Sequence, residues 1–281
     1  MIRRRARDQR RPGVRIVLGP RDEALLRGLA RFRIATTGQL VRIFFRDVRR
    51  DTAVPRLRRL YDAAVLDIVT APRNGENVYA VGRAGRRWLE DRGIACGAAP
   101  HGSLAHPLTV VDAWAALASA LHGGVDVRLV RFVPDWQGRA EAAGTVARVV
   151  PDATIDLAVR RASQRALPVR VFLEVDLATE RAGVLGRKLT AYGLERAGEG
   201  VGLAVVLADA GDRRVETVRR LAAEHWPSWS VVCRRSEWPD ALLAHEALAP
   251  LAASPDGEGG PVDATHCDAT PGSSQGEGPS R

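Results

Sequence analysis

Apolar residues recur at helical spacing in three successive stretches of the first third of the chain. The first stretch begins at Pro20, the second follows Thr36 or Thr37, and the third follows Asp51 or Thr52, all residues suited to a helix N-terminus. The apolar positions expected to face inward are Leu25, Leu26, Leu29, Phe32, Leu40, Val41, Ile43, Phe44, Val54, Leu57, Leu60 and Tyr61. The pattern therefore predicts three amphipathic helices.

Two runs of β-forming residues follow the third helix. VLDIVTAP and VYAVG flank an Asn-Gly dipeptide, which predicts a β-hairpin. A fourth helix is expected from about Ala84 to Asp91, ended by Gly93. Three helices and a hairpin are the order of a winged helix-turn-helix, whose third helix enters the major groove. We therefore expect a winged-helix DNA-binding domain over residues 20–94.

The rest of the chain alternates between strand and helix patterns. Residues 95–105 are small and glycine-rich, as in a linker. Strands are expected at 125–133, 154–159, 169–177, 201–208 and 229–233, and helices at 106–121, 181–194 and 212–224. This alternation predicts an α/β domain with a mixed sheet over residues 106–250. Residues 251–281 keep no apolar period and are expected to form a disordered tail.

Positive charge is concentrated at the N-terminal end. Residues 1–95 contain 23 arginines and 10 acidic residues, a net charge of +13, whereas the remainder holds 19 basic and 23 acidic residues, a net charge of −4. Such asymmetry is typical of a module that binds phosphates. Residues 1–19 are accordingly expected to be a basic, flexible arm.

Double-stranded DNA is thus the expected partner. The candidate contacts are Arg49, Arg50, Arg56 and Arg59 on or before the third helix and Arg73 at the tip of the wing. A protein-interaction role stays open, because winged helices also serve in docking and dimerisation.

Other classes of protein are disfavoured by composition. No run of 18 apolar residues exists, and no apolar segment follows the basic N-terminus, so neither a membrane span nor a secretory signal is expected. The three cysteines are widely spaced, which argues against disulfides and zinc and suits the cytoplasm. Of the 42 basic residues only Lys188 is a lysine, so its position is of interest.

The second half carries a possible catalytic constellation. Asp152 precedes one predicted strand, Glu174 and Asp176 alternate on the next, and Lys188 follows on a helix with Tyr192 one turn later. Carboxylates held together repel one another, and Mg²⁺ would relieve this repulsion. Asp152, Glu174, Asp176 and Lys188 are therefore candidate catalytic residues, with Lys188 stabilising negative charge during phosphodiester cleavage.

This succession resembles the PD-(D/E)xK nucleases. The resemblance implies that Asp152 and Glu174 hold metal, and that Asp112, as an acid from the first helix of the domain, joins them. Asp176 stands at the position where the motif has a lysine. The resemblance therefore implies that Lys188 would supply the missing positive charge from the following helix.

Over residues 20–235 the chain more closely resembles the replication-relaxation family of Gram-positive bacteria and their plasmids. FLEVDLATE followed by K-L-x-x-Y is the most specific element. The resemblance implies a role in replication, relaxation or transfer of plasmids or mobile elements, with replication or transfer proteins as partners.

Three functional readings remain open. The first is a Mg²⁺-dependent nicking or cleaving enzyme guided by its winged helix. The second is a non-catalytic replication or transcription factor whose nuclease-like domain serves assembly. The third is a homodimer that places two winged helices on an inverted repeat. The carboxylates can also be structural, with Glu174 and Asp176 on an exposed sheet face beside Arg170 and Arg187.

Overall fold

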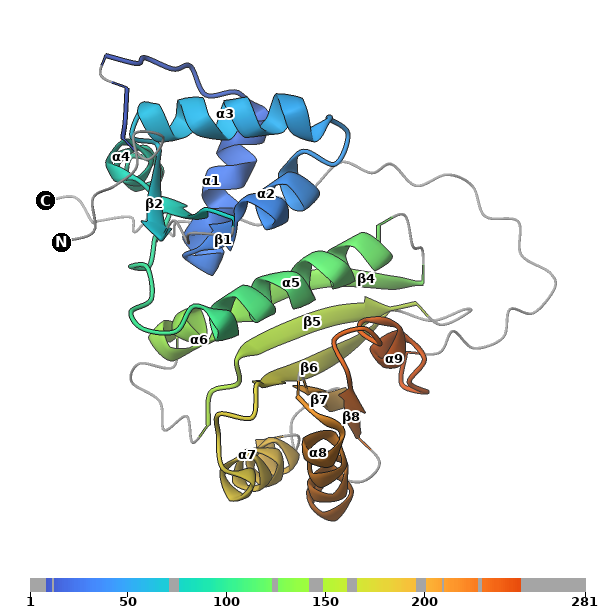
Figure 1. The fold of residues 1–281 in the computed structure, drawn as a ribbon. Helices are drawn as coiled ribbons and strands as arrows, with labels where there is room; N and C mark the ends of the chain where they lie inside the picture. The colour runs from blue at the N-terminus through green and yellow to red at the C-terminus, as the bar shows by residue number, and fades with distance from the viewer. Residues whose placement is uncertain are drawn as a thin grey trace, which may run out of the picture. The chain divides into compact units, whose positions relative to one another are not determined.

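The described residues form a mixed α/β fold with two separate β-sheets (Figure 1). The computed structural model describes residues 9–11, 13–70, 76–122, 126–141, 149–160, 166–195, 201–208, 210–226 and 229–248. Met1–Leu251 forms one compact unit. The α/β fold class expected from the sequence is confirmed at this level. Arg73 and the tail expected over 251–281 lie outside the described residues.

The N-terminal elements surround a small antiparallel sheet. They are α1 (Pro20–Phe32), β1 (Ala35–Thr36), α2 (Thr37–Phe44), α3 (Arg50–Asp62), β2 (Leu66–Thr70), β3 (Val78–Val81) and α4 (Arg83–Glu90). β3 lies between β1 and β2 and pairs antiparallel with both. The four helices and the hairpin pairing predicted from the sequence are confirmed. The two-residue strand β1 was not predicted, because two residues are too few to show a period.

The helix starts follow local hydrogen bonding. Thr36 caps α2: its side chain accepts from the Gln39 N–H, and the Gln39 side chain accepts from the Thr36 N–H. The predicted cap of α3 is wrong, because the helix begins at Arg50 with Arg49 as its N-cap. Asp51 lies instead in the first turn, where a carboxylate stabilises the helix dipole.

The buried side of α3 also differs from expectation at one position. Leu57, Leu60 and Tyr61 are buried as predicted, but Val54 is 38% exposed and Ala53 is buried in its place. The inward stripe therefore runs at i, i+4, i+7 and i+8 from Ala53, and Val54 lies on the outer side of the helix.

The segment before α1 lies along α3. The Arg11 N–H donates to Asp62 at 3.0 Å, the Arg58 guanidinium donates to the Gln9 carbonyl, and the Arg56 guanidinium donates to the Val17 carbonyl at 3.0 Å. The described part of the expected flexible arm is thus held by hydrogen bonds. Residues 1–8 and 12 are outside the described ranges.

The C-terminal elements form a five-stranded mixed sheet with helices on both faces. They are α5 (Ala105–Ala120), β4 (Val127–Pro134), α6 (Asp135–Glu141), β5 (Ala153–Val159), β6 (Leu167–Asp176), α7 (Ala182–Glu195), β7 (Val201–Ala208), α8 (Asp212–His225), β8 (Ser230–Cys233) and α9 (Asp240–Leu243). The order is β4-β5-β6-β7-β8, antiparallel through β6 and parallel from β6 to β8. The predicted mixed sheet is confirmed, whereas the short helices α6 and α9 were not predicted.

Alternation along β6 separates the two faces of this sheet. Val171, Leu173 and Val175 join the apolar core that includes residues of α5. Phe172 joins a second cluster with residues of α7 and α8, which cover the opposite face (Figure 1). Glu174 therefore faces α7, on the same side of the sheet as Phe172.

The N-terminal elements share a core with α5 and the large sheet. The Phe32 ring lies 4.9 Å from the Trp114 ring and 5.9 Å from the Phe132 ring, centroid to centroid. The Gln39 side chain donates to the Leu108 carbonyl at 2.8 Å, and the Trp136 indole donates to the Arg31 carbonyl at 2.6 Å. No helix among the described residues is long and apolar enough to cross a membrane.

Candidate functional site

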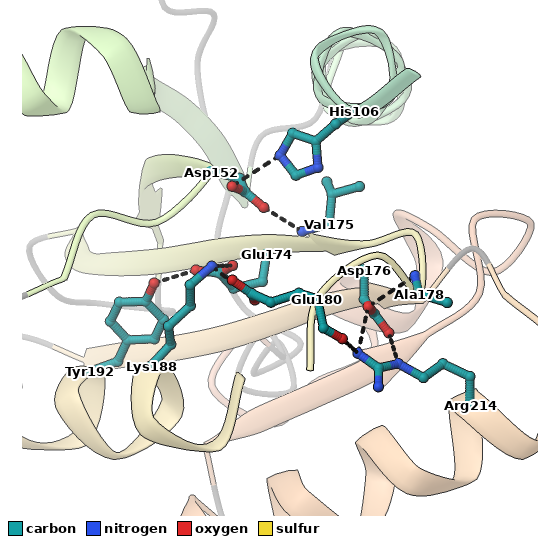
Figure 2. A network of polar contacts seen from close by, with 10 residues as sticks. All are labelled: His106, Asp152, Glu174, Val175, Asp176, Ala178, Glu180, Lys188, Tyr192 and Arg214. Atoms are coloured by element: carbon teal, nitrogen blue, oxygen red, sulfur yellow. Dashed lines mark hydrogen bonds and ion pairs between the residues drawn. The ribbon is translucent and has the colours of Figure 1, made fainter. Parts of the chain in front are cut away.

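Glu174 lies at the centre of a polar network on the α7 side of the sheet (Figure 2). It is 2% exposed. Its Oε2 accepts from the Lys188 ammonium at 2.9 Å, and its Oε1 accepts a short hydrogen bond from the Tyr192 hydroxyl. Lys188 and Tyr192 are four residues apart on α7, so they reach the same strand residue together. The Tyr192 ring is fixed by stacking on Phe172 at 4.8 Å.

Lys188 bridges two acidic side chains. Its Nζ lies 3.3 Å from Oε2 of Glu180 in addition to the contact with Glu174. Burial opposes the charge of Lys188, but the neighbouring Glu174, Asp152 and Glu180 outweigh it and raise the pKa of the ammonium. The single lysine of the chain therefore serves as a counter-ion to the buried Glu174 carboxylate and to the partly exposed Glu180.

Asp176 is neutralised by a different cation. The Arg214 guanidinium donates to its two oxygens through Nε at 2.7 Å and Nη2 at 2.9 Å, and the Ala178 N–H donates to Oδ1 at 3.1 Å. Arg214 also donates to the Glu180 carbonyl at 2.8 Å. Such a fork-shaped pair is a strong and directional contact. Asp176 stands at the position where the nuclease motif has a lysine. In the structure it is buried and pairs with Arg214 of α8.

Asp152 connects the start of β5 to α5. Its Oδ2 accepts from the Val175 N–H at 2.8 Å, and its Oδ1 lies 3.0 Å from Nε2 of His106 (Figure 2). The hydrogen bond to Asp152 raises the pKa of His106 despite burial, with further contributions from Glu174 and Asp135. No local pattern in the sequence joins His106 to Asp152, because the two residues are 46 positions apart.

The electrostatics of Glu174 reflect its burial. Burial and the charge of Asp152 raise its pKa to about 7, against the opposing effects of Lys188 and Tyr192. Asp152 is therefore an electrostatic neighbour of Glu174. Glu174 and Asp176 are both buried, and Arg170 pairs with Asp156 at 2.8 Å, so the alternative of an exposed sheet face is wrong.

Asp112 belongs to another cluster. On α5 it forms ion pairs with Arg42 of α2 and with Arg235 after β8. It follows His106 by six residues, about 9 Å along a helix axis. The structure does not bring Asp112 together with Asp152 and Glu174.

A Mg²⁺ ion at these carboxylates would compete with contacts inside the chain. The oxygens of Asp152, Glu174 and Asp176 already accept from donors of the protein or lie beside them. Within the described ranges, no group of three His, Cys, Asp or Glu residues is placed to hold a metal ion. The three carboxylates are instead paired with cationic groups and hydrogen-bond donors of the same chain.

The candidate DNA contacts occupy different environments. Arg49, Arg50 and Arg59 are exposed; Arg49 lies 3.6 Å from Asp51, and Arg50 is paired with Glu76 at 2.6 Å. The Arg56 guanidinium is partly buried and donates to both oxygens of Asp22. Arg56 therefore joins α3 to α1, whereas Arg49 and Arg59 are available at the surface.

Arg214 and Glu180 are members of the network that the sequence did not indicate. Arg214 lies 38 residues after Asp176 among many other arginines, so no local pattern identifies it.

Comparison of the sequence with known protein families gives one match. The sequence matches the replication-relaxation family over residues 26–198. The chain belongs to this family, as the FLEVDLATE and K-L-x-x-Y elements predict. No curated protein and no solved structure matches it.

Proposed function

We propose that this protein binds duplex DNA through its N-terminal elements and acts in the replication or relaxation of plasmid or mobile-element DNA. Family membership supports the process. The element order α1, α2, α3, hairpin β2–β3 and α4 supports a winged helix, with α3 as the helix that enters the major groove.

The observation that carries this proposal is the segregation of charge. The net charge of +13 over residues 1–95 contrasts with −4 over the remainder. Arg46, Arg49, Arg50 and Arg59 are exposed on α3 or the loop before it. Exposed arginines close to a helix that can enter a groove are suited to phosphate and base contacts.

The C-terminal sheet supports a non-catalytic role within the same proposal. Its succession of Asp152, Glu174 and Asp176 is similar to that of PD-(D/E)xK nucleases. In this chain, however, other side chains form hydrogen bonds or ion pairs with these carboxylates: Lys188, Tyr192, His106 and Arg214. We propose that this part is a nuclease-derived assembly domain in which charge pairing has replaced metal binding.

DNA binding is tested by the salt dependence of the affinity for a mixed-sequence duplex. Because phosphate contacts release counter-ions, the dissociation constant should rise steeply between about 50 and 200 mM salt. Arg59→Ala should weaken binding and reduce the slope of log K against log salt by about 1. Arg220→Ala removes the same charge from the exposed surface of α8 and is the matched control. Equal effects of the two variants, or no binding by the wild type, would contradict the proposal.

A further inference from the structure

The segment that precedes α1 is hydrogen-bonded to α3 at two points. The Arg11 N–H donates to Oδ1 of Asp62 at 3.0 Å at the end of α3. The Arg56 guanidinium, nearer the start of the helix, donates to the Val17 carbonyl at 3.0 Å. The earlier residue of the segment thus meets the later residue of the helix, so the two run antiparallel. We call residues 9–11 and 13–18 the anchored segment, which lies beside α3 (Figure 1).

Arg10 holds the N-terminal end of the anchored segment in place. Its guanidinium donates to the Tyr61 carbonyl, to the Leu66 carbonyl at 2.9 Å and to Oδ1 of Asp67 at 2.9 Å. Its Cζ also lies over the Tyr61 ring, 4.3 Å from the ring centroid. A guanidinium can satisfy three acceptors at once because it carries five N–H donors in a rigid planar fork, which an ammonium lacks. The charge of Arg10 is therefore directed at the protein.

The side chains of the anchored segment alternate between the core and solvent. Ile16 and Leu18 pack against the apolar core, whereas Arg11, Arg15 and Val17 are exposed. Alternation of this kind is typical of an extended backbone, in which successive side chains point to opposite sides. The extended backbone therefore directs Arg15 away from the core.

The fold does not depend on the charges of Arg11 and Arg15. Arg15 forms no hydrogen bond or ion pair with another described residue. At Arg11 it is the backbone N–H that contacts Asp62, and this carboxylate is already paired with the Arg58 guanidinium at 3.0 Å. Both exposed guanidiniums are thus available to an anionic partner.

The two arginines lie close to the α3 residue that we propose contacts DNA. The anchor points Arg56 and Asp62 are six residues apart, about 9 Å along the helix axis, and Arg59 lies midway between them. Duplex DNA carries one negative charge for about every 1.7 Å of its axis, so a duplex at Arg59 presents several phosphates over this distance. The anchored segment is therefore within reach of the same duplex.

We propose that the anchored segment is a preformed part of the DNA interface, in which Arg11 and Arg15 contact phosphates beside the groove that α3 enters. The inference rests on the proposed DNA binding. Because the segment is already hydrogen-bonded to the helix, DNA does not have to order it, which lowers the entropic cost of association. Phosphate contacts carry no sequence information, so their contribution is the same for any duplex.

The salt dependence of duplex affinity tests the two contacts. Loss of one phosphate contact reduces the slope of log K against log salt by about 1 and weakens binding about five- to tenfold at about 100 mM salt. We expect these changes for Arg11→Ala and for Arg15→Ala, to the same extent on duplexes of unrelated sequence. Arg220→Ala, on the exposed surface of α8, is the control that removes the same charge.

Arg10→Lys tests whether the segment must be held in place. Lysine keeps the charge but cannot donate to the three acceptors of Arg10 together, so the segment should detach from α3. Binding should weaken about fivefold, because DNA then has to order the segment. Arg220→Lys is the matched control, and circular dichroism checks that both variants are folded. Affinity equal to that of the wild type in Arg10→Lys would show that the segment acts through its charge alone, and would overturn the proposal.

The outcomes separate this inference from the proposed function. If Arg59→Ala weakens duplex binding but Arg11→Ala and Arg15→Ala behave like the Arg220→Ala control, the inference fails and DNA binding stands. If the wild type binds no duplex, both fail.

Discussion

The ammonium of Lys188 lies 2.9 Å from Oε2 of Glu174, so the one lysine of the chain is paired with a carboxylate that is 2% exposed. The resemblance to PD-(D/E)xK nucleases implied that this lysine would act on the scissile phosphate. Here its charge is directed at a protein carboxylate. The one lysine among the 42 basic residues is thus the counter-ion of a buried carboxylate.

Removing the lysine should destabilise the fold. Lys188→Met keeps the length of the side chain but leaves Glu174 buried without its cation, which should lower the free energy of unfolding by about 3 kcal/mol. Urea denaturation measures this change. The double variant Lys188→Met/Glu174→Gln should recover a large part of the loss, because no buried charge remains. A Lys188→Met variant as stable as the wild type would show that the pair is unimportant.

Stability should depend on pH through Glu174. Its pKa is raised by burial from an ordinary value of 4.5 to about 7, so in this pH range the folded state binds more protons than the unfolded state. The free energy of unfolding should therefore fall as the pH rises from about 4.5 to 7, relative to Glu174→Gln. Urea denaturation at a series of pH values checks this. Parallel pH profiles for the two proteins would contradict the raised pKa.

Arg56 and Arg59 should separate stability from DNA binding. Arg56→Ala removes the guanidinium from the buried Asp22 carboxylate, which keeps the Gly19 N–H as a donor, and should lower the free energy of unfolding by about 2 kcal/mol. Arg59 is exposed, so Arg59→Ala should leave thermal unfolding nearly unchanged. A loss of thermal stability in Arg59→Ala, or none in Arg56→Ala, would contradict these roles.

Divalent cations should have little effect on the carboxylate network. We expect that Mg²⁺ or Mn²⁺ does not raise the melting temperature, and that supercoiled plasmid stays intact while its mobility on a gel shifts. EDTA and Glu174→Ala serve as controls. Nicking that requires metal and disappears in Glu174→Ala would establish an active site and overturn the non-catalytic proposal.

Elements with a long and regular period could be predicted from the sequence. β5, β6 and β7 alternate or are continuously apolar, and α1 has a clear inward stripe, so their positions followed from local pattern. α6 has seven residues with Gly138 among them and no apolar stripe, and it was not predicted.

Only some members of the polar network could be read from the sequence. The order of Asp152, Glu174 and Lys188 was readable, but pairing depends on which side chains meet in space. Asp112 shows the difficulty, since its partners Arg42 and Arg235 are 70 and 123 residues away. Because arginines occur throughout the chain, no local sequence pattern identifies the arginine that pairs with a given carboxylate.

The packing of Phe32 between Trp114 and Phe132 has a consequence for experiments that divide the chain. A fragment ending near residue 95 would lose both aromatic partners and the Leu108 carbonyl that Gln39 contacts. It would present an uncovered apolar surface to water, with a tendency to aggregate. The N-terminal elements therefore cannot be transferred to another protein by themselves, and a transplanted segment would have to include α5.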